Sequence, residues 1–199
     1  VARNMKSGYV NDSAVLVIPM TYDFNNESLT EGDFREGYAV ITLKKKAGLI
    51  DTSGNRILPA VYEDLRFASD TLPVAARKKG KWGYVSMENK TVVDFRYEDA
   101  QPFHGSLAVV KLKGKEGVID TTGKLRVAAE YNSIRIHADG MEIRKMGTGL
   151  LSTSLVPLVA PEYDSCTPAA PGIFRFERQK KFGYYSVTKK EWVWREEGL

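Results

Sequence analysis

The chain has 199 residues, of which 43% are hydrophobic and 27% charged, and its formal net charge is +4 at pH 7. This composition is typical of a folded globular protein and excludes the disordered and fibrous classes. No apolar run approaches the roughly 18–20 residues that span a bilayer. The single cysteine, Cys166, excludes an internal disulfide framework, and with His104 and His137 as the only histidines there is no Cys/His metal cluster. We therefore expect neither a metal nor a cofactor.

The first thirty residues contain no signal-peptide pattern, and the chain begins at Val1. We expect that a leader was removed or that the sequence is part of a longer protein. Periplasm, cell surface and cytoplasm all stay open as compartments.

A short motif recurs along the chain: a glycine, two strand-forming residues, a small polar residue and then a turn. Its clearest copies are GLIDTSG, GYVSMEN and GVIDTTG, and the motif glycines are Gly8, Gly48, Gly83, Gly117, Gly149 and Gly183. The differences between their successive positions are 40, 35, 34, 32 and 34. Self-similarity at a period of this length is typical of repeat proteins.

A second marker follows the same period. A tyrosine beside an acidic residue recurs at Tyr22, Tyr62, Tyr97, Tyr131 and Tyr163, and the differences between these positions are 40, 35, 34 and 32. The two markers shift together. This agreement indicates a single domain over residues 1–199 that contains six repeats, each of roughly 32–40 residues.

Each repeat has the pattern of β-structure. In the fourth copy, strand formers at 107–112 and 116–120 are joined by a Lys/Gly turn, and 124–127 alternates like a half-buried strand. Asp51 and Gly54 occupy the first and fourth positions of a predicted type I turn. We predict about three antiparallel strands per repeat in an open, twisted, solenoid-like all-β array. A closed ring resembling a β-propeller is the alternative.

A glycine inside every repeat needs a physical reason, because glycine weakens a strand. We expect an aromatic ring from an adjacent strand to lie over each bare backbone position. The alternative is a ligand that approaches the backbone there.

The segment KGKWGYV at Lys79–Val85, with FREGYAV from Phe34 and ILPAVYEDL from Ile57, resembles the WG-repeat (KWG) proteins. The resemblance extends from about Ser7 to about Trp194, although Trp82 is the one motif tryptophan that is kept. It implies an all-β array of variable copy number, mainly bacterial, without general enzymatic activity and with a role in protein interaction.

Lysines recur in the first turn of the repeats, at Lys45, Lys79, Lys113, Lys145 and Lys180. We predict that stacking aligns them along one edge, a candidate site for a protein partner or an anionic polymer, and that the acidic residues gather on a different edge. Solvated hairpin tips are the alternative. Specific nucleic-acid binding is not indicated, because arginine is scarce among these lysines and no exposed aromatic is periodic.

The last predicted strand places Trp192 and Trp194 on the same face, as an end cap or as an anchor for a partner. Two irregular segments, 23–33 and 166–172, are predicted surface loops. Cys166 is expected to be semi-exposed there, and no convergent catalytic set includes it, His104 or His137. We predict a non-catalytic module for protein–protein interaction; the alternative is a module that binds an anionic or carbohydrate polymer, and an enzyme is the least supported class.

Overall fold

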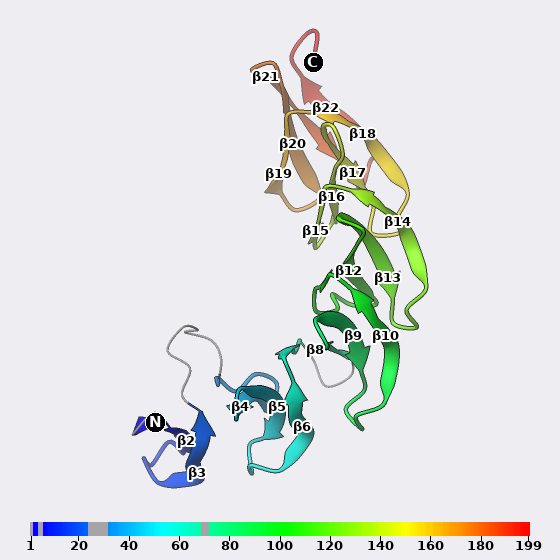
Figure 1. Ribbon diagram of the computed structural model, residues 1–199. Helices are drawn as coiled ribbons and strands as arrows, with labels where there is room; N and C mark the ends of the chain where they lie inside the picture. Colours follow the sequence, from blue (N-terminus) through cyan, green and yellow to red (C-terminus); the bar gives the residue numbers. More distant parts are fainter. Residues whose placement is uncertain (1, 4–5, 24–31, 69–71) are drawn as a thin grey trace. The chain divides into compact units, whose positions relative to one another are not determined.

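The computed structural model describes residues 2–3, 6–23, 32–68 and 72–199, and all the regular elements in these residues are β-strands (Figure 1). The strands form six small antiparallel sheets, numbered here in chain order, and each sheet is built from one stretch of chain. The prediction of an all-β array of antiparallel meander repeats is confirmed. No helix long and apolar enough to cross a membrane occurs in the described residues.

The chain divides into two compact units, Val1–Ala108 with Asp120–Lys124, and Val109–Ile119 with Leu125–Leu199. The first three sheets are β1 (Ala2–Arg3), β2 (Lys6–Val10), β3 (Leu16–Asp23); β4 (Tyr38–Leu43), β5 (Lys46–Asp51), β6 (Arg56–Tyr62); and β7 (Asp64–Arg66), β8 (Val74–Lys78), β9 (Lys81–Val85), β10 (Thr91–Tyr97). The last three are β11 (Asp99–Ala100), β12 (Leu107–Leu112), β13 (Lys115–Asp120), β14 (Leu125–Tyr131); β15 (Ser133–His137), β16 (Gly140–Arg144), β17 (Thr148–Leu151), β18 (Pro157–Tyr163); and β19 (Ser165–Ala170), β20 (Ile173–Arg178), β21 (Lys181–Ser186), β22 (Glu191–Arg195).

Four of the six sheets have four strands, so the prediction of about three strands per repeat is wrong for the third to sixth sheets. The additional strand is β7, β11, β15 or β19, which starts just after the marker tyrosine and forms one edge of its sheet. β7 and β11 have three and two residues, too few to show a period of two in the sequence.

The predicted Asp–Gly turns are present. The Gly54 N–H donates to the Asp51 carbonyl oxygen at 2.9 Å, and the Ser53 N–H donates to the Asp51 carboxylate at 2.9 Å. Gly54 has φ +82°, and Asn89, which takes the glycine position in the next repeat, has φ +62°. Both residue types adopt the left-handed conformation more easily than most others do.

The repeated glycine lies opposite a bulge in the next strand. Trp82 pairs with Tyr97 and Tyr84 pairs with Val93, so the single residue Gly83 faces three residues of β10. A Cβ added to Gly83 would lie 2.6 Å from the Val93 carbonyl oxygen. Main chain therefore covers this glycine, and the expectation of an aromatic ring over the backbone is wrong here.

The same arrangement recurs at four other glycines. Gly8, Gly48, Gly117 and Gly149 each face three residues of the following strand, and an added Cβ would meet backbone atoms at 2.6–3.0 Å. In all five bulged copies the residue before the glycine pairs with the marker tyrosine, and the positions of glycine and tyrosine differ by the same number, 14. The shared bulge explains why the two sequence markers shift together. Gly183 differs, because its nearest neighbours are Leu199 and Arg195 side-chain atoms.

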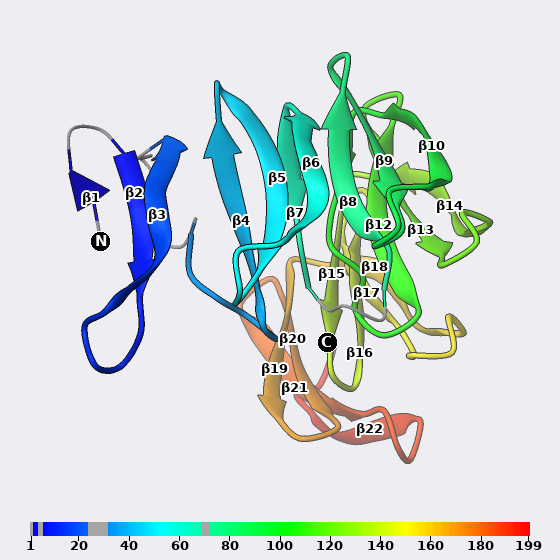
Figure 2. The same cartoon turned by 90° about the horizontal axis from the view of Figure 1, so that it is seen from below.

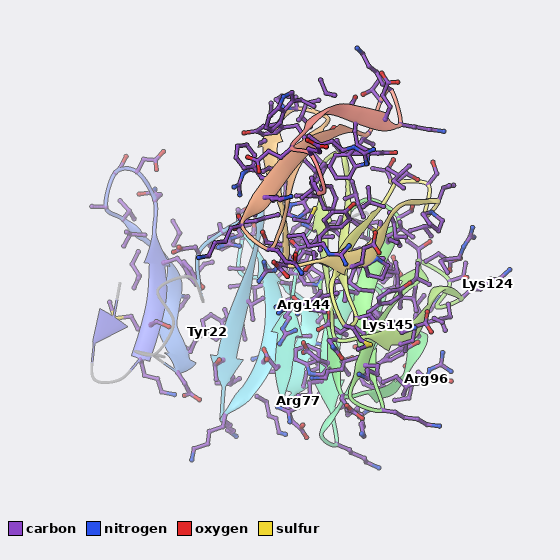
Figure 3. The ribbon with its side chains drawn as sticks, turned by 90° about the horizontal axis from the view of Figure 1, so that it is seen from above. Tyr22, Arg77, Arg96, Lys124, Arg144 and Lys145 are labelled. Atoms are coloured by element: carbon purple, nitrogen blue, oxygen red, sulfur yellow. The ribbon has the colours of Figure 1, made fainter. Side chains whose placement is uncertain are left out.

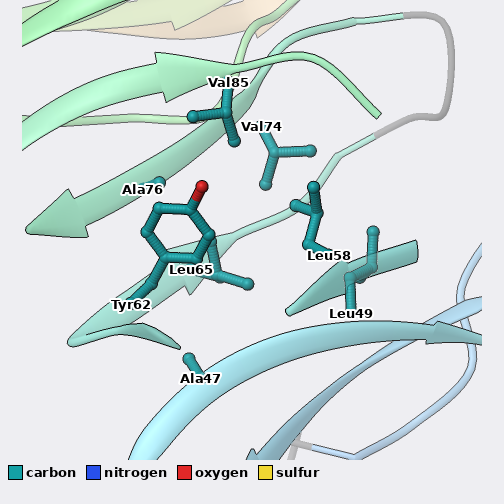
Figure 4. Packing of buried hydrophobic residues seen from close by; sticks show 8 residues of the cluster. All are labelled: Ala47, Leu49, Leu58, Tyr62, Leu65, Val74, Ala76 and Val85. Atoms are coloured by element: carbon teal, nitrogen blue, oxygen red, sulfur yellow. The ribbon is translucent and has the colours of Figure 1, made fainter. Parts of the chain in front are cut away.

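The core lies between successive sheets, and an interior sheet contributes both of its faces. The residue after the glycine packs toward the following sheet: Leu49 shares a cluster with Val74 and Val85 of the third sheet (Figure 4). The next residue packs toward the preceding sheet, since Ile50 clusters with Ile18 of the first sheet. In the first unit the sheets thus form successive layers (Figure 2).

Residues 166–172 are not a surface loop as predicted. Most of the segment belongs to β19, and Cys166 is buried at 2% exposure among apolar side chains. Proline in the sequence argued for a loop, but β19 is an edge strand, where a residue without an N–H is tolerated. In the other predicted loop, residues 24–31 lie outside the described residues.

Candidate functional site

The predicted lysine edge consists of hairpin tips. Lys45, Lys79, Lys113 and Lys180 lie in two-residue turns with positive φ at both positions, as in the type I′ turns that match strand twist. Lys145 lies in a longer turn, where its N–H donates to the Gly147 carbonyl oxygen at 2.9 Å. All five lysines are exposed.

Acidic residues lie at the same tips, so the prediction that they gather on a different edge is wrong. The Glu63 carboxylate accepts the Gly80 N–H at 2.9 Å, and the Asp164 carboxylate accepts the Gln179 N–H at 2.7 Å. Asp23 accepts the Lys45 N–H at 3.1 Å. In each case a carboxylate that follows one repeat's bulge holds the hairpin tip of the next repeat.

Two of these carboxylates, Glu63 and Asp23, have a lowered pKa. Hydrogen bonding from the Gly80 N–H is the main cause of the lowered pKa of Glu63, and the Lys6 side chain is the main cause of the lowered pKa of Asp23. Carboxylates at the tips also form ion pairs, with Arg77 for Glu63 at 3.7 Å and with Lys145 for Glu130 at 3.1 Å. Figure 3 labels the two cationic partners, Arg77 and Lys145. The hairpin tips therefore carry mixed charge rather than lysines alone.

Trp192 and Trp194 lie on opposite faces of the sixth sheet, so the prediction of a shared face is wrong. Trp192 pairs with Tyr185 and Trp194 pairs with Tyr184, and the register shifts between these pairs. Val193 is the extra residue at this irregularity. Because of it, Trp194 lies on the opposite face of the sheet from the one that strict alternation of side chains predicts.

Trp192 belongs to the core between the fifth and sixth sheets. Its ring lies 5.7 Å from Tyr163, 5.5 Å from Phe176 and 5.5 Å from Tyr185, measured between centroids. Aromatic pairs at such separations stabilise beyond their buried area.

Trp194 belongs to a separate aromatic face, which we call the terminal face: Phe182, Tyr184 and Trp194. The Trp194 ring lies 5.3 Å from Phe182 and 6.2 Å from Tyr184, yet Trp194 is 49% exposed. The Arg175 guanidinium lies 4.8 Å from the Phe182 ring centroid and anchors one side of this face.

The repeat register shows why the terminal face is unusual. Tyr184 follows its repeat glycine directly. In the first sheet this position is held by the half-buried Tyr9, but in the second to fifth sheets the residues there, namely Leu49, Tyr84, Val118 and Leu150, are all 0% exposed. These counterparts are buried, whereas Tyr184 is only half-buried and no further sheet covers it in the described part of the chain. Within the described residues the sixth sheet thus leaves uncovered the face that the second to fifth sheets bury.

The residues considered for catalysis are not arranged for it. Burial, and then the nearby Glu142 carboxylate, raise the pKa of the Cys166 thiol to about 12, so the prediction of a semi-exposed thiol is wrong and a thiolate nucleophile is disfavoured. His137 Nε2 lies 3.6 Å from Glu142 Oε2, whereas His104 is in an exposed turn of the first unit. Nowhere in the described ranges do three or more candidate metal ligands converge.

Consecutive meander sheets, joined by apolar layers and by carboxylate-bound hairpin tips, define a β-repeat protein. The family model described as WG containing repeat matches residues 48–82, 82–115 and 117–141. The resemblance to WG-repeat proteins is thus confirmed over these residues. Comparison with curated proteins gave no significant match.

Several solved structures match the chain at low sequence identity, and one of them has a TM-score above 0.5. A crystal structure of a eukaryotic initiation factor matches with TM-score 0.59 and 11% identity, over 94% of this chain and 61% of that one. Kluyveromyces lactis Hsv2 matches with TM-score 0.47 and 13% identity, over 77% of this chain and 60% of that one. A Bacteroides caccae protein of unknown function matches with TM-score 0.32 and 12% identity, over 92% of this chain and 86% of that one. This chain thus spans less than two thirds of the first two relatives' length.

Proposed function

We propose that the protein is a non-catalytic repeat module that binds a protein partner, with the terminal face as its anchor. The observation that carries the proposal is the 49% exposure of Trp194 beside the half-buried Tyr184, whose counterparts in the second to fifth sheets are fully buried. Tryptophan, tyrosine and arginine are enriched among the residues that contribute most of the binding free energy at protein interfaces.

The order of the terminal face supports this proposal. Its three rings contact one another, and Arg175 is further fixed by an ion pair to Glu177 at 3.0 Å. A face whose side chains are already ordered loses little conformational entropy when a partner binds. The mixed charge of the hairpin tips gives less support to an anionic polymer, because carboxylates lie at the same tips as the lysines.

The proposal is tested with Trp194→Ser, compared with Val156→Ser as a matched control. Val156 is also an exposed apolar residue of the second unit, at 51% exposure, but it lies away from the terminal face. Proteins that co-purify with the wild-type chain in the native host should be lost with Trp194→Ser and kept with Val156→Ser. Equal recovery with both variants, at equal stability to urea, would refute the proposed anchor.

A further inference from the structure

A groove in the first unit has a volume of about 310 Å³ and lies between the second and third sheets. Its apolar surface comes from Tyr38 and Val40 of β4, from Leu65 of β7 and from Phe67, which directly follows β7. The rings of Tyr38 and Phe67 lie 5.5 Å apart and pack against the buried core. These contacts fix the apolar surface in place without a ligand.

One side of the groove is occupied by a satisfied polar network. Arg66 Nη1 donates to the Asp99 carboxylate at 2.8 Å and to the Ala100 carbonyl oxygen at 2.9 Å, and the Arg66 guanidinium lies 4.2 Å from the Trp82 ring centroid. Gln101 donates to the other Asp99 oxygen at 3.1 Å. Asp99 therefore neutralises Arg66, and this side of the groove has no free charge to offer.

Arg35 supplies the available positive charge. It is exposed, and its guanidinium has no hydrogen bond or ion pair to any of the described residues. Its backbone is nevertheless fixed, because Arg35 and Tyr38 exchange two backbone hydrogen bonds, of 2.8 and 2.9 Å, around a two-residue turn. Asp33, a carboxylate two residues before Arg35, also lines the groove.

The borders of the groove favour an extended chain as its occupant. β4 and β7 are both edge strands, and among the described strands each pairs with only one neighbour, although the backbone groups of Tyr38 at the start of β4 already bond to Arg35. An edge strand offers backbone N–H and C=O groups to an added segment, and side-chain pockets beside it select the residues of that segment.

From this combination we propose that the groove binds an extended segment of a partner protein in which a bulky apolar side chain is followed by Asp or Glu. The apolar side chain packs on Tyr38 and Phe67, and the carboxylate pairs with Arg35. The groove belongs to the first unit and the terminal face to the second, so either proposal can be refuted without affecting the other.

The test uses the full chain labelled with ¹⁵N and the capped peptide acetyl-Ser-Phe-Asp-Val-amide. Saturable shifts are expected at the amides of Tyr38, Arg66 and Phe67, and Arg35→Gln should weaken binding by about fivefold, the upper range for an exposed ion pair. Arg56→Gln is the matched control, because Arg56 is an exposed arginine of β6 outside the groove. It should bind the peptide as the wild type does.

Replacing Asp by Asn in the peptide should weaken binding to the same extent, and replacing Phe by Ala should abolish it. The inference is overturned if no probe shifts these amides, or if the Asn peptide binds as tightly as the Asp peptide. It is also overturned if free N-acetylphenylalanine binds as tightly as the tetrapeptide, because the groove would then be a site for small carboxylates.

Discussion

Gly83→Ala tests the structural role of the repeated glycine. An alanine Cβ would lie 2.6 Å from the Val93 carbonyl oxygen, 2.9 Å from the Phe95 nitrogen and 3.0 Å from the Asp94 carbonyl carbon. All three are backbone atoms, so no side chain can rotate away, and the bulge of β10 itself must move.

The expected loss follows from that movement. Disturbing two ladder hydrogen bonds costs roughly 1 kcal/mol each, and overpacking adds roughly 1–2 kcal/mol. Alanine restricts the unfolded chain and returns roughly 1 kcal/mol. Gly83→Ala should therefore lower the free energy of unfolding by about 2–3 kcal/mol, which for a chain of this length lowers the melting temperature by about 5–10 °C.

Urea and thermal unfolding followed by far-ultraviolet circular dichroism measure the loss, with Gly80→Ala as the matched control. Gly80 lies in the same hairpin with φ +73°, but nothing lies within 4 Å of an added Cβ. Its replacement should cost about 1–2 kcal/mol, from the left-handed conformation alone. If Gly83→Ala is as stable as the wild type, or costs no more than Gly80→Ala, main-chain contact is not the reason for the glycine.

Three further predictions concern charge, the thiol and a turn. Because the folded-state pKa values of Asp23 and Glu63 are lowered, their stabilisation is present above the unfolded pKa and is lost as the pH falls through the folded value. Urea midpoints should decline below about pH 4.5, less steeply for Glu63→Gln, and an increase on acidification would contradict this. Cys166, with a pKa of about 12, should react with iodoacetamide far more slowly in the native protein than in urea, and equal rates would show that it is accessible. Ala14, exposed with φ +59° at the turn position of Gly54, should accept glycine with a gain of up to about 1 kcal/mol in urea unfolding, whereas a loss would show that the turn is not strained.

The period and the turns could be predicted from the sequence because they depend on local backbone chemistry. Each turn is specified within a few residues, by Asp51 and Gly54 in one repeat and by Asn89 in the next, whatever packs around it. The bulge opposite Gly83 depends on how two strands align, and nothing in either strand alone reveals three residues facing one. The signal that could have found it is the constant spacing along the sequence between each motif glycine and its tyrosine, such as Gly83 and Tyr97.

The errors about charge and tryptophan have the same physical origin. The acids lie far from the lysines along each repeat, which suggests a different edge, but Glu63 contacts Gly80 across the boundary between two repeats. Strict alternation places Trp192 and Trp194 on one face, and the register shift at Val193 interrupts it. Contacts and irregularities of this kind are set by tertiary pairing, which residue order does not encode directly.

The constant distance from glycine to tyrosine determines where this architecture tolerates changes in length. The hairpin that runs from the motif glycine to the marker tyrosine has the same length in all five bulged repeats. The stretch from a tyrosine to the next glycine varies in length, and it is shortest from Tyr131 to Gly149 and longest from Tyr22 to Gly48. An insertion inside the hairpin would break the match between glycine and bulge, while one placed between the first and second strands of the next sheet, such as between β11 and β12, lengthens a connection. Peptide tags or whole domains are therefore best inserted in these connections, where natural variation has already been accommodated.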